Sequence, residues 1–179
     1  MLKKMRGFTL IELLIVVAII GILAALLIPN AIAAIQKAKQ KGTMKDINSL
    51  ATAVTDYITD NGIAPSAQNS WGTIQSATAT ALSTIYLKVV PQNDQWNYPF
   101  RMQCGGSASS VGGYGNVSCT GADDFVIASF GRNRAPDTFD FDPTSPASAY
   151  FQISNMDSYN MDLVNWNGSW VHAPKAGQQ

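Results

Sequence analysis

The sequence predicts an α+β protein in which one long N-terminal helix carries a small head built on an antiparallel β-sheet. Three features of the chain indicate this class. Residues 13–35 contain no charged side chain, residues 36–62 repeat apolar positions at helical spacing, and residues 63–179 combine short strand-like stretches with frequent Gly, Ser, Thr, Asn and Pro. We expect residues 8–35 to cross a membrane, residues 36–62 to form an amphipathic helix, and residues 63–179 to form the head.

The composition excludes several classes of protein. Hydrophobic residues make up 46% of the 179 residues and charged residues only 13%, which is not the composition of a disordered chain. The 12 basic residues balance the 12 acidic ones, so no charge excess favours a nucleic-acid partner. One His and two Cys leave little material for a zinc site or a thiol active site. We therefore expect a protein that is not an enzyme.

The first predicted element is a membrane-spanning helix. About 20 apolar residues cross a bilayer core of about 30 Å, and the uncharged run over residues 13–35 exceeds that length. Lys3, Lys4 and Arg6 precede the run and are expected to stay cytoplasmic, which places the head outside the inner membrane. A secretory signal peptide is one alternative. Such a peptide would end at a cleavage site of small residues, whereas the apolar run here continues to residue 35. A plain membrane anchor is another, but neither accounts for the carboxylate of Glu12 inside the apolar segment.

Residues 6–14 read Arg-Gly-Phe-Thr-Leu-Ile-Glu-Leu-Leu and resemble the processing motif of the type IV pilin-like proteins. The resemblance covers residues 4–34 without a gap. It implies that a prepilin peptidase removes residues 1–7 as a leader, by cutting between Gly7 and Phe8, and methylates the new Phe8 amine. It also implies that Glu12 guides assembly by pairing with the Phe8 amine of a neighbouring subunit. Opposite charges attract strongly once water is excluded, so this pairing would satisfy both groups.

Pro29 lies inside the apolar helix. A proline removes one helical hydrogen bond and clashes with the preceding turn, at a cost of about 3 kcal/mol, so we expect a kink. In the resembling family this proline marks a stretch that can lose helical hydrogen bonds as the filament forms. A simple kink and local melting on assembly are both open at this point.

The helix is expected to continue beyond the membrane. Steps of three and four residues join a set of apolar positions into one stripe, namely Met44, Ile47, Leu50, Ala51, Val54, Tyr57 and Ile58. Asn61 and Gly62 form a stop signal, because glycine tolerates the left-handed conformation at a helix end. The stripe predicts packing against the protein's own head, and a groove for a partner is the alternative.

The head is expected to hold a small antiparallel sheet. Strand-like stretches occur at residues 98–104, 125–130, 163–166 and 169–172, and Asn167-Gly168 between the last two is a strong hairpin signal. Residues 77–85 predict either a short helix or a loop of small residues. His172 is expected at the surface of an edge strand, and the four Trp residues are expected in the core or at subunit contacts.

Cys104 and Cys119 are the only cysteines. In an oxidising compartment beyond the inner membrane, an even number of cysteines favours a disulfide. Closure of a loop of about 15 residues would stabilise the head by roughly 3 kcal/mol. Two unrelated buried thiols are the alternative, and the absence of a Cys-x-x-Cys pair argues against a redox role.

Within the family, residues 86–100, 125–132 and 162–168 resemble segments of the major pseudopilins of type II secretion systems. Gln95 and Asn97 depart from that pattern, as does the longer head. The resemblance implies a calcium site in the loop before the last hairpin, and calcium takes six to eight oxygen ligands. Asp137 and Asp162 are the candidate ligands among the acidic residues at positions 137, 140, 142, 157 and 162. Simple solvation of these carboxylates is the alternative.

These expectations describe a structural filament subunit held in the inner membrane with its head in the periplasm. The resemblance implies copies of itself, the prepilin peptidase, and an inner-membrane platform with an ATPase as partners. It implies no required cofactor, and calcium at the site above is the one candidate ligand. The pseudopilus of a type II secretion system is the predicted assembly. A major or minor type IV pilin of a surface pilus is the alternative within the family, and a membrane-anchored periplasmic binding module is the alternative from a different class.

Overall fold

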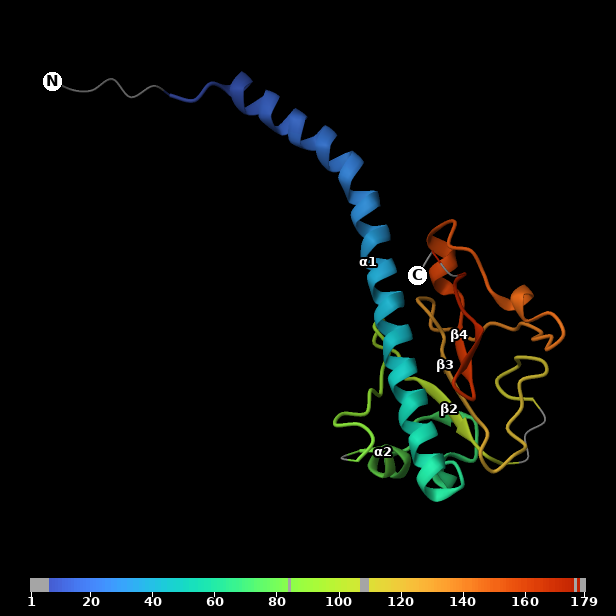
Figure 1. Cartoon of the computed structure of the whole chain (residues 1–179). Helices are drawn as coiled ribbons and strands as arrows, with labels where there is room; N and C mark the ends of the chain where they lie inside the picture. The colour runs from blue at the N-terminus through green and yellow to red at the C-terminus, as the bar shows by residue number, and fades with distance from the viewer. Residues whose placement is uncertain (1–6, 84, 107–109, 176, 178–179) are drawn as a thin grey trace. The chain divides into compact units, whose positions relative to one another are not determined.

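The computed structural model describes residues 7–83, 85–106, 110–175 and 177. The described chain divides into two compact units, one ending at Gln36 and the other comprising Lys37–Gln179. Figure 1 shows the order of the elements along the chain. Lys3, Lys4 and Arg6, for which we expect a cytoplasmic location, lie outside the described residues.

Helix α1 spans Leu10–Asn61 and belongs to both units. At its start, the Leu13 amide donates a hydrogen bond to the Thr9 carbonyl oxygen at 3.3 Å. It ends where Gly62 adopts φ of +75° and donates its amide to the Ile58 carbonyl at 2.7 Å. Both the long helix and its glycine stop are as the sequence predicts.

In the first unit, α1 is apolar on every side. No side chain between residues 7 and 36 is buried, and Pro29 lies inside the helix without ending it. The proline cannot donate to the carbonyl of Ala25, one turn earlier. The Asn30 side chain donates to the Leu26 carbonyl at 3.3 Å. The predicted kink at Pro29 stays a prediction.

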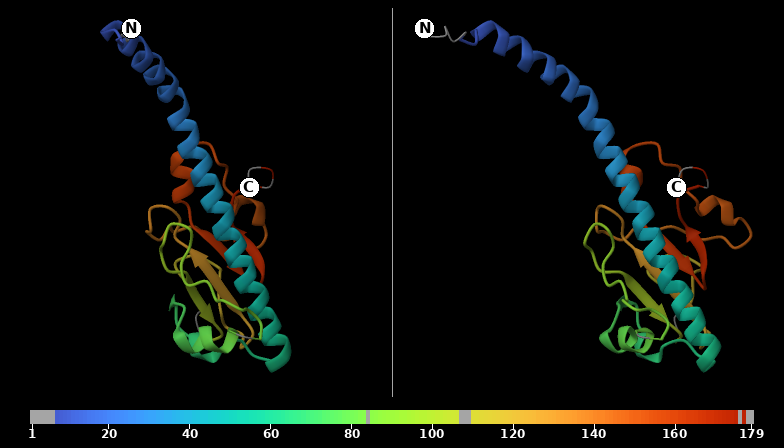
Figure 2. Two further views of the ribbon diagram at one scale, coloured as in Figure 1. Left: turned by 90° about the vertical axis from the view of Figure 1, so that its left-hand side faces the viewer. Right: turned by 60° about the vertical axis from the view of Figure 1, so that its left-hand side comes forward.

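In the second unit, the apolar stripe of α1 packs on one face of the sheet (Figure 2). Met44, Ile47, Leu50, Ala51 and Val54 are buried there, and the stripe ends in the half-buried pair Tyr57 and Ile58. The helix-facing cluster includes Phe100, Met102, Ile127 and Leu163 from the head. The stripe therefore packs against the protein's own head, as predicted.

The sheet is an antiparallel meander in the order β1-β2-β3-β4-β5. Its strands are β1 (Gly72–Thr73), β2 (Arg101–Cys104), β3 (Phe125–Ser129), β4 (Leu163–Trp166) and β5 (Ser169–His172). In the central pair, Met102 lies opposite Ile127. The turn between β4 and β5 has φ of +49° at Asn167 and +82° at Gly168, as a hairpin with an Asn-Gly turn requires. The α+β class and four of the five strands agree with the prediction, whereas the two-residue β1 was not expected.

The face of the sheet away from α1 is covered by loops. A second apolar cluster forms there and includes Val111, Tyr114, Val117, Phe141 and Val164. Helix α2 (Ser76–Leu82) and the 3-10 helices η1 (Ser66–Gln68), η2 (Pro146–Ala149) and η3 (Met156–Asn160) complete the head. The alternative between a helix and a loop at residues 77–85 is thus resolved in favour of a short helix.

Candidate processing, assembly and metal sites

The junction between Gly7 and Phe8 lies just before α1, outside any regular element. A Cβ placed on Gly7 would meet no atom within 4 Å, and Gly7 does not adopt the left-handed conformation that favours glycine. The Phe8 side chain is 75% exposed. Nothing in the described part of the subunit therefore requires glycine at position 7, so a requirement for it would come from an external partner such as a peptidase.

Glu12 and Thr9 form a capping box at the start of α1. The Glu12 Oε2 atom accepts the Thr9 amide at 2.8 Å and the Thr9 hydroxyl at 2.7 Å, while the Glu12 amide donates to the Thr9 hydroxyl oxygen at 3.3 Å. Such boxes satisfy helix N–H groups that have no intrahelical acceptor. The Thr-x-x-Glu spacing is visible in the sequence, yet the box was not predicted, because the resemblance assigns Glu12 only to a partner subunit.

Beyond Glu12, the helix exposes an apolar surface. Leu10 is 84% exposed, Leu26 is 68% exposed and Val16 is 47% exposed. The helix is long and apolar enough to cross a membrane, with a mean hydropathy of 3.1 in its most apolar window. Exposure of an apolar surface this large to water is unfavourable. This segment therefore needs lipid or neighbouring subunits, which is consistent with membrane anchoring.

The structure brings the two candidate calcium ligands together. The Asp137 amide donates to Asp162 Oδ2 at 3.1 Å, and the Asp162 amide donates to Asp137 Oδ2, also at 3.1 Å. The Tyr114 hydroxyl donates to Asp162 Oδ2 at 2.7 Å. Asp162 is fully buried, and its Oδ1 atom has no hydrogen-bond partner among the residues that the structure describes. Burial raises the pKa of the Asp162 carboxyl to about 7.

The other acidic residues of this region do not join the pair. Asp142 accepts the amide and hydroxyl of Thr144 in an exposed turn. Asp157 is exposed in η3 and Asp140 is exposed before Phe141. Within the described ranges, no three His, Cys, Asp or Glu side chains gather closely enough to hold a metal ion. A calcium ion would therefore combine the orphaned Asp162 Oδ1 and Asp137 with carbonyl and water oxygens.

Cys104, at the end of β2, and Cys119, in the loop before β3, are buried free thiols in this structure. The Cys119 thiol donates to the carbonyl of Gln103, the residue next to Cys104, at 3.9 Å. Burial raises the pKa of the Cys119 thiol to about 12 and raises the pKa of Cys104 as well. Both are protonated near neutral pH, so neither is a nucleophile. The predicted disulfide is not formed here and stays a prediction.

The expectation of a surface position for His172 is wrong. His172 is only 3% exposed, and its Nδ1 atom lies 2.6 Å from the Asp162 carbonyl oxygen. Phe139 stacks on its ring with centroids 4.2 Å apart, and Phe151 packs at 5.1 Å. Although β5 is an edge strand, these loop residues cover its end. Burial lowers the pKa of His172, which leaves it a neutral core residue.

The comparisons with known proteins agree with the geometry at the start of the chain and with part of the head. Residues 2–28 match the family model described as the prokaryotic N-terminal methylation motif. Residues 30–140 match the model for type II secretion system protein G. The second match ends before the segment that carries Asp162.

Individual relatives of the chain are named as core protein G of type II secretion systems or as a type IV pilin. Type II secretion system core protein G of Aeromonas hydrophila is 30% identical over 115 residues, which are 61% of this chain and 80% of that protein. The core protein G of Dickeya chrysanthemi is 27% identical over 144 residues, 77% of this chain and 84% of that protein. Type IV major pilin protein PilA of Myxococcus xanthus is 44% identical over 84 residues, 41% of this chain and 38% of that protein. No solved structure gives a match.

Proposed function

Because the chain belongs to the type II secretion system protein G family, we propose that it is the major pseudopilin of such a system, a structural subunit that polymerises from the inner membrane. The observation that carries this role is the apolar first unit of α1, which the subunit leaves uncovered directly after the Gly7–Phe8 junction. In the membrane, lipid covers this surface. In a filament, neighbouring helices would cover it instead.

Glu12 has the geometry to take part in assembly without losing its cap. Both hydrogen bonds from Thr9 go to Oε2, and among the described residues no donor contacts Oε1. Cleavage after Gly7 would create an amine on Phe8 of each subunit. The free Oε1 could accept that amine from a neighbour while Oε2 continues to cap the helix, which gives an ion pair strengthened by the exclusion of water.

Two substitutions distinguish the helix-capping role of Glu12 from the role of its negative charge. Glu12→Ala removes both, whereas Glu12→Gln keeps an oxygen that can accept from Thr9 but removes the charge. We expect both variants to be processed and membrane-bound but to form no filaments. Immunoblots of membranes report the processed subunit, and sheared filaments report assembly. Normal filaments from Glu12→Gln would contradict the charge pairing, and normal filaments from Glu12→Ala would contradict any role of Glu12 in assembly.

The proposed partners follow from this role. The leader would be removed by a prepilin peptidase, and copies of the chain would polymerise on an inner-membrane platform powered by an ATPase, with the head in the periplasm. We propose no catalytic role. Two observations support the proposal that the protein is not catalytic. The two thiols are protonated, and the only histidine is buried with its Nδ1 atom against a carbonyl oxygen.

A type IV pilin of a surface pilus is the second candidate, and the 44% identity to the Myxococcus xanthus pilin favours it. Deletion of the gene in the native host distinguishes the two candidates. For a pseudopilin, secreted proteins accumulate in the periplasm and surface filaments persist. Loss of surface filaments with normal secretion would identify a pilin. Complementation with the intact gene is the control.

We also propose that Asp137 and Asp162 bind calcium, on the ground that Asp162 Oδ1 is buried without a partner. The ion would neutralise two adjacent carboxylates and fix the loop before β4. Thermal unfolding in calcium and in EDTA tests the site. We expect a higher melting temperature in calcium, and no such difference in Asp162→Asn. Equal melting of the unsubstituted protein in both buffers would contradict the site.

A further inference from the structure

Four lysines follow the apolar run of α1 directly, and all of them belong to the second unit. They are the first charged residues after Glu12, and the next acidic residue is Asp46. Residues 36–45 therefore carry four positive charges and no negative one. We call these four residues the lysine collar, which consists of Lys37, Lys39, Lys41 and Lys45.

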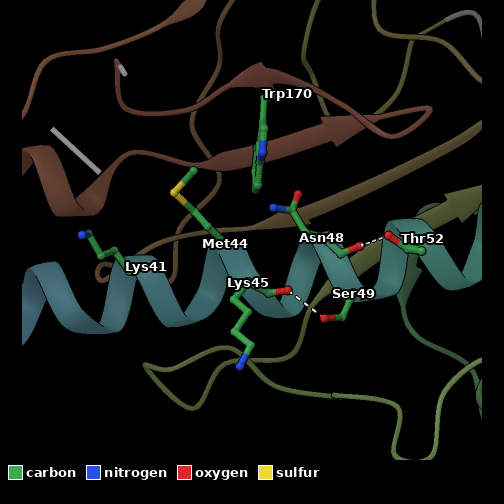
Figure 3. Close-up of a pocket in the computed structure, with 7 residues that line it drawn as sticks. All are labelled: Lys41, Met44, Lys45, Asn48, Ser49, Thr52 and Trp170. Atoms are coloured by element: carbon green, nitrogen blue, oxygen red, sulfur yellow. Dashed lines mark hydrogen bonds between the residues drawn. The ribbon is translucent and has the colours of Figure 1, made fainter. Parts of the chain in front are cut away.

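The charge of the lysine collar is not compensated within the described part of the chain. None of the four lysines has an ion-pair partner there, and the side chains of Lys41 and Lys45 are exposed. These two residues line a groove of about 480 Å³ whose other lining residues are uncharged (Figure 3). The carboxylate of Asp46 accepts a hydrogen bond from the Gln95 side-chain amide at 2.8 Å instead. The collar is therefore available to an anionic partner outside the subunit.

A bilayer around the apolar run places lipid headgroups beside the lysine collar. A hydrocarbon core of about 30 Å is flanked on each side by a headgroup layer of about 5–8 Å. Ile35 ends the uncharged run, and Lys37 and Lys41 follow it by about 3 Å and about 9 Å of helix. Lys45 follows by about 15 Å, which is within a Debye length of roughly 8 Å from the headgroup layer.

Helix geometry directs the side chains of the collar toward the membrane. In an α-helix every Cα–Cβ bond tilts toward the N-terminus, and from the collar this direction leads to the apolar run. Figure 3 shows the Lys41 side chain extended toward that end of the helix. A lysine can also lay its apolar stem along the helix while its ammonium group reaches the polar layer. In a bilayer, the ammonium groups of Lys37 and Lys41 would therefore lie at the depth of the lipid phosphates.

We propose that the lysine collar binds the headgroups of anionic phospholipids in the membrane leaflet on the side of the head. Lys37 and Lys41 make the main contacts, because they lie at headgroup depth and only about 40° apart around the helix axis. Lys39 points to the other side of the helix and contacts a second lipid. Each lysine close to an anionic membrane surface strengthens the attachment about fivefold.

The position of the collar favours lipid over a soluble acidic partner. Headgroups occupy this depth whenever the subunit is held in the bilayer, whereas a soluble partner would have to enter the headgroup layer. The inference rests on the membrane-anchored subunit of the proposed function. It adds that the subunit selects anionic lipids, and that a subunit entering a filament must first break these contacts.

The lipid preference of the full-length chain tests the collar. Purified protein is reconstituted into nanodiscs of mixed phosphatidylglycerol and phosphatidylcholine, and native mass spectrometry identifies the lipids that stay bound. The unsubstituted chain should retain phosphatidylglycerol in preference to phosphatidylcholine. Lys37→Gln and Lys41→Gln should each lower this preference about fivefold, and the double variant about 25-fold, since one and two charges are lost. Lys41→Arg keeps the charge and should keep the preference.

Lys88→Gln is the matched control, because it removes one positive charge far from the collar. Lys88 is exposed and lies two residues from Tyr86, whose hydroxyl donates to the Asp60 carboxylate at 3.0 Å. Asp60 lies about 28 Å of helix beyond Lys41. The control should keep the preference for phosphatidylglycerol. An equal loss in Lys88→Gln and Lys41→Gln would mean that net charge alone selects the lipid, and would overturn the site.

Lysine acetylation by a water-soluble ester locates the contact. In nanodiscs that contain phosphatidylglycerol, Lys37 and Lys41 should react more slowly than in nanodiscs of phosphatidylcholine alone, and Lys88 should react equally in both. Circular dichroism should show that every variant is folded.

Two kinds of failure are distinguishable. Equal retention of both lipids by the unsubstituted chain, or an unchanged preference in the double variant, would overturn the lipid contact and leave the proposed function standing. Failure of the unsubstituted chain to enter the nanodisc bilayer would instead contradict the membrane-anchored subunit on which the inference rests.

Discussion

Gly131 follows β3 and packs against the segment that leads into Asp162. It adopts φ of +61°, and a Cβ at this position would lie 2.8 Å from the carbonyl oxygens of Asn160 and Met161 and 2.9 Å from that of Tyr159. Close carbon–oxygen contacts in proteins begin at about 3.3 Å, and these oxygens belong to backbone. The Tyr159 carbonyl is also held by the Arg132 amide at 2.8 Å. Gly131→Ala must therefore displace backbone.

The expected cost has two parts. A left-handed alanine costs about 1–2 kcal/mol, and overpacking against a fixed neighbour adds about 1–3 kcal/mol. We therefore expect Gly131→Ala to lower the free energy of unfolding by about 2–5 kcal/mol, which corresponds to a fall in melting temperature of roughly 10 °C for a head of this size. Thermal unfolding followed by circular dichroism in detergent measures this change.

Gly113→Ala is the matched control. Gly113 also has a left-handed φ, +82°, but the nearest atom to its Cβ position is a side-chain methyl group of Thr138 at 3.7 Å. It should lose only the conformational part, about 1–2 kcal/mol. Equal losses in the two variants would refute the steric argument, because they would mean that the carbonyls around Gly131 yield without cost.

Three other predictions concern the head and its cysteines. Leu50→Ala removes a fully buried side chain between α1 and the sheet and should cost about 2–5 kcal/mol in chemical denaturation, whereas the exposed Thr59→Ala should change the stability by less than about 0.5 kcal/mol. Asp94→Ala removes the carboxylate that accepts the amides of residues 96 and 98 and the hydroxyl of residue 129. It should lower the free energy of unfolding by about 2–4 kcal/mol in the same assay, and a loss below about 1 kcal/mol would contradict this expectation. If Cys104 and Cys119 form the predicted disulfide in the periplasm, the denatured protein should react with iodoacetamide only after reduction. Two labels without reductant, detected by mass spectrometry, would contradict the bond.

The elements predicted correctly from the sequence are those whose signals are local. The uncharged run over residues 13–35 and the stripe from Met44 to Ile58 are properties of one helix read along its own sequence, and both appear in α1. The Asn167-Gly168 turn likewise specifies the β4–β5 hairpin through its own backbone conformation. Strand β1 has only two residues, too few for an alternating pattern to be recognised.

The residues predicted incorrectly, or left open, depend on distant segments. The burial of His172 comes from Phe139 and Phe151, which are far away in the sequence and carry no pattern that points to β5. The pairing of Asp137 with Asp162 likewise needs the loop before β4 to fold back on itself. In the sequence both carboxylates are candidates by resemblance, and only the fold shows that each accepts the backbone amide of the other residue.

The burial pattern of α1 explains how one helix can serve two environments. Up to Gln36 no side chain is buried, although the sequence there is apolar on every side, and a helix that is apolar all round requires a surrounding apolar medium. From Gln40 onward the buried positions fall on one stripe, and the exposed positions are polar, so the head satisfies this half within the subunit. Only the first half therefore needs lipid or neighbouring helices to cover it.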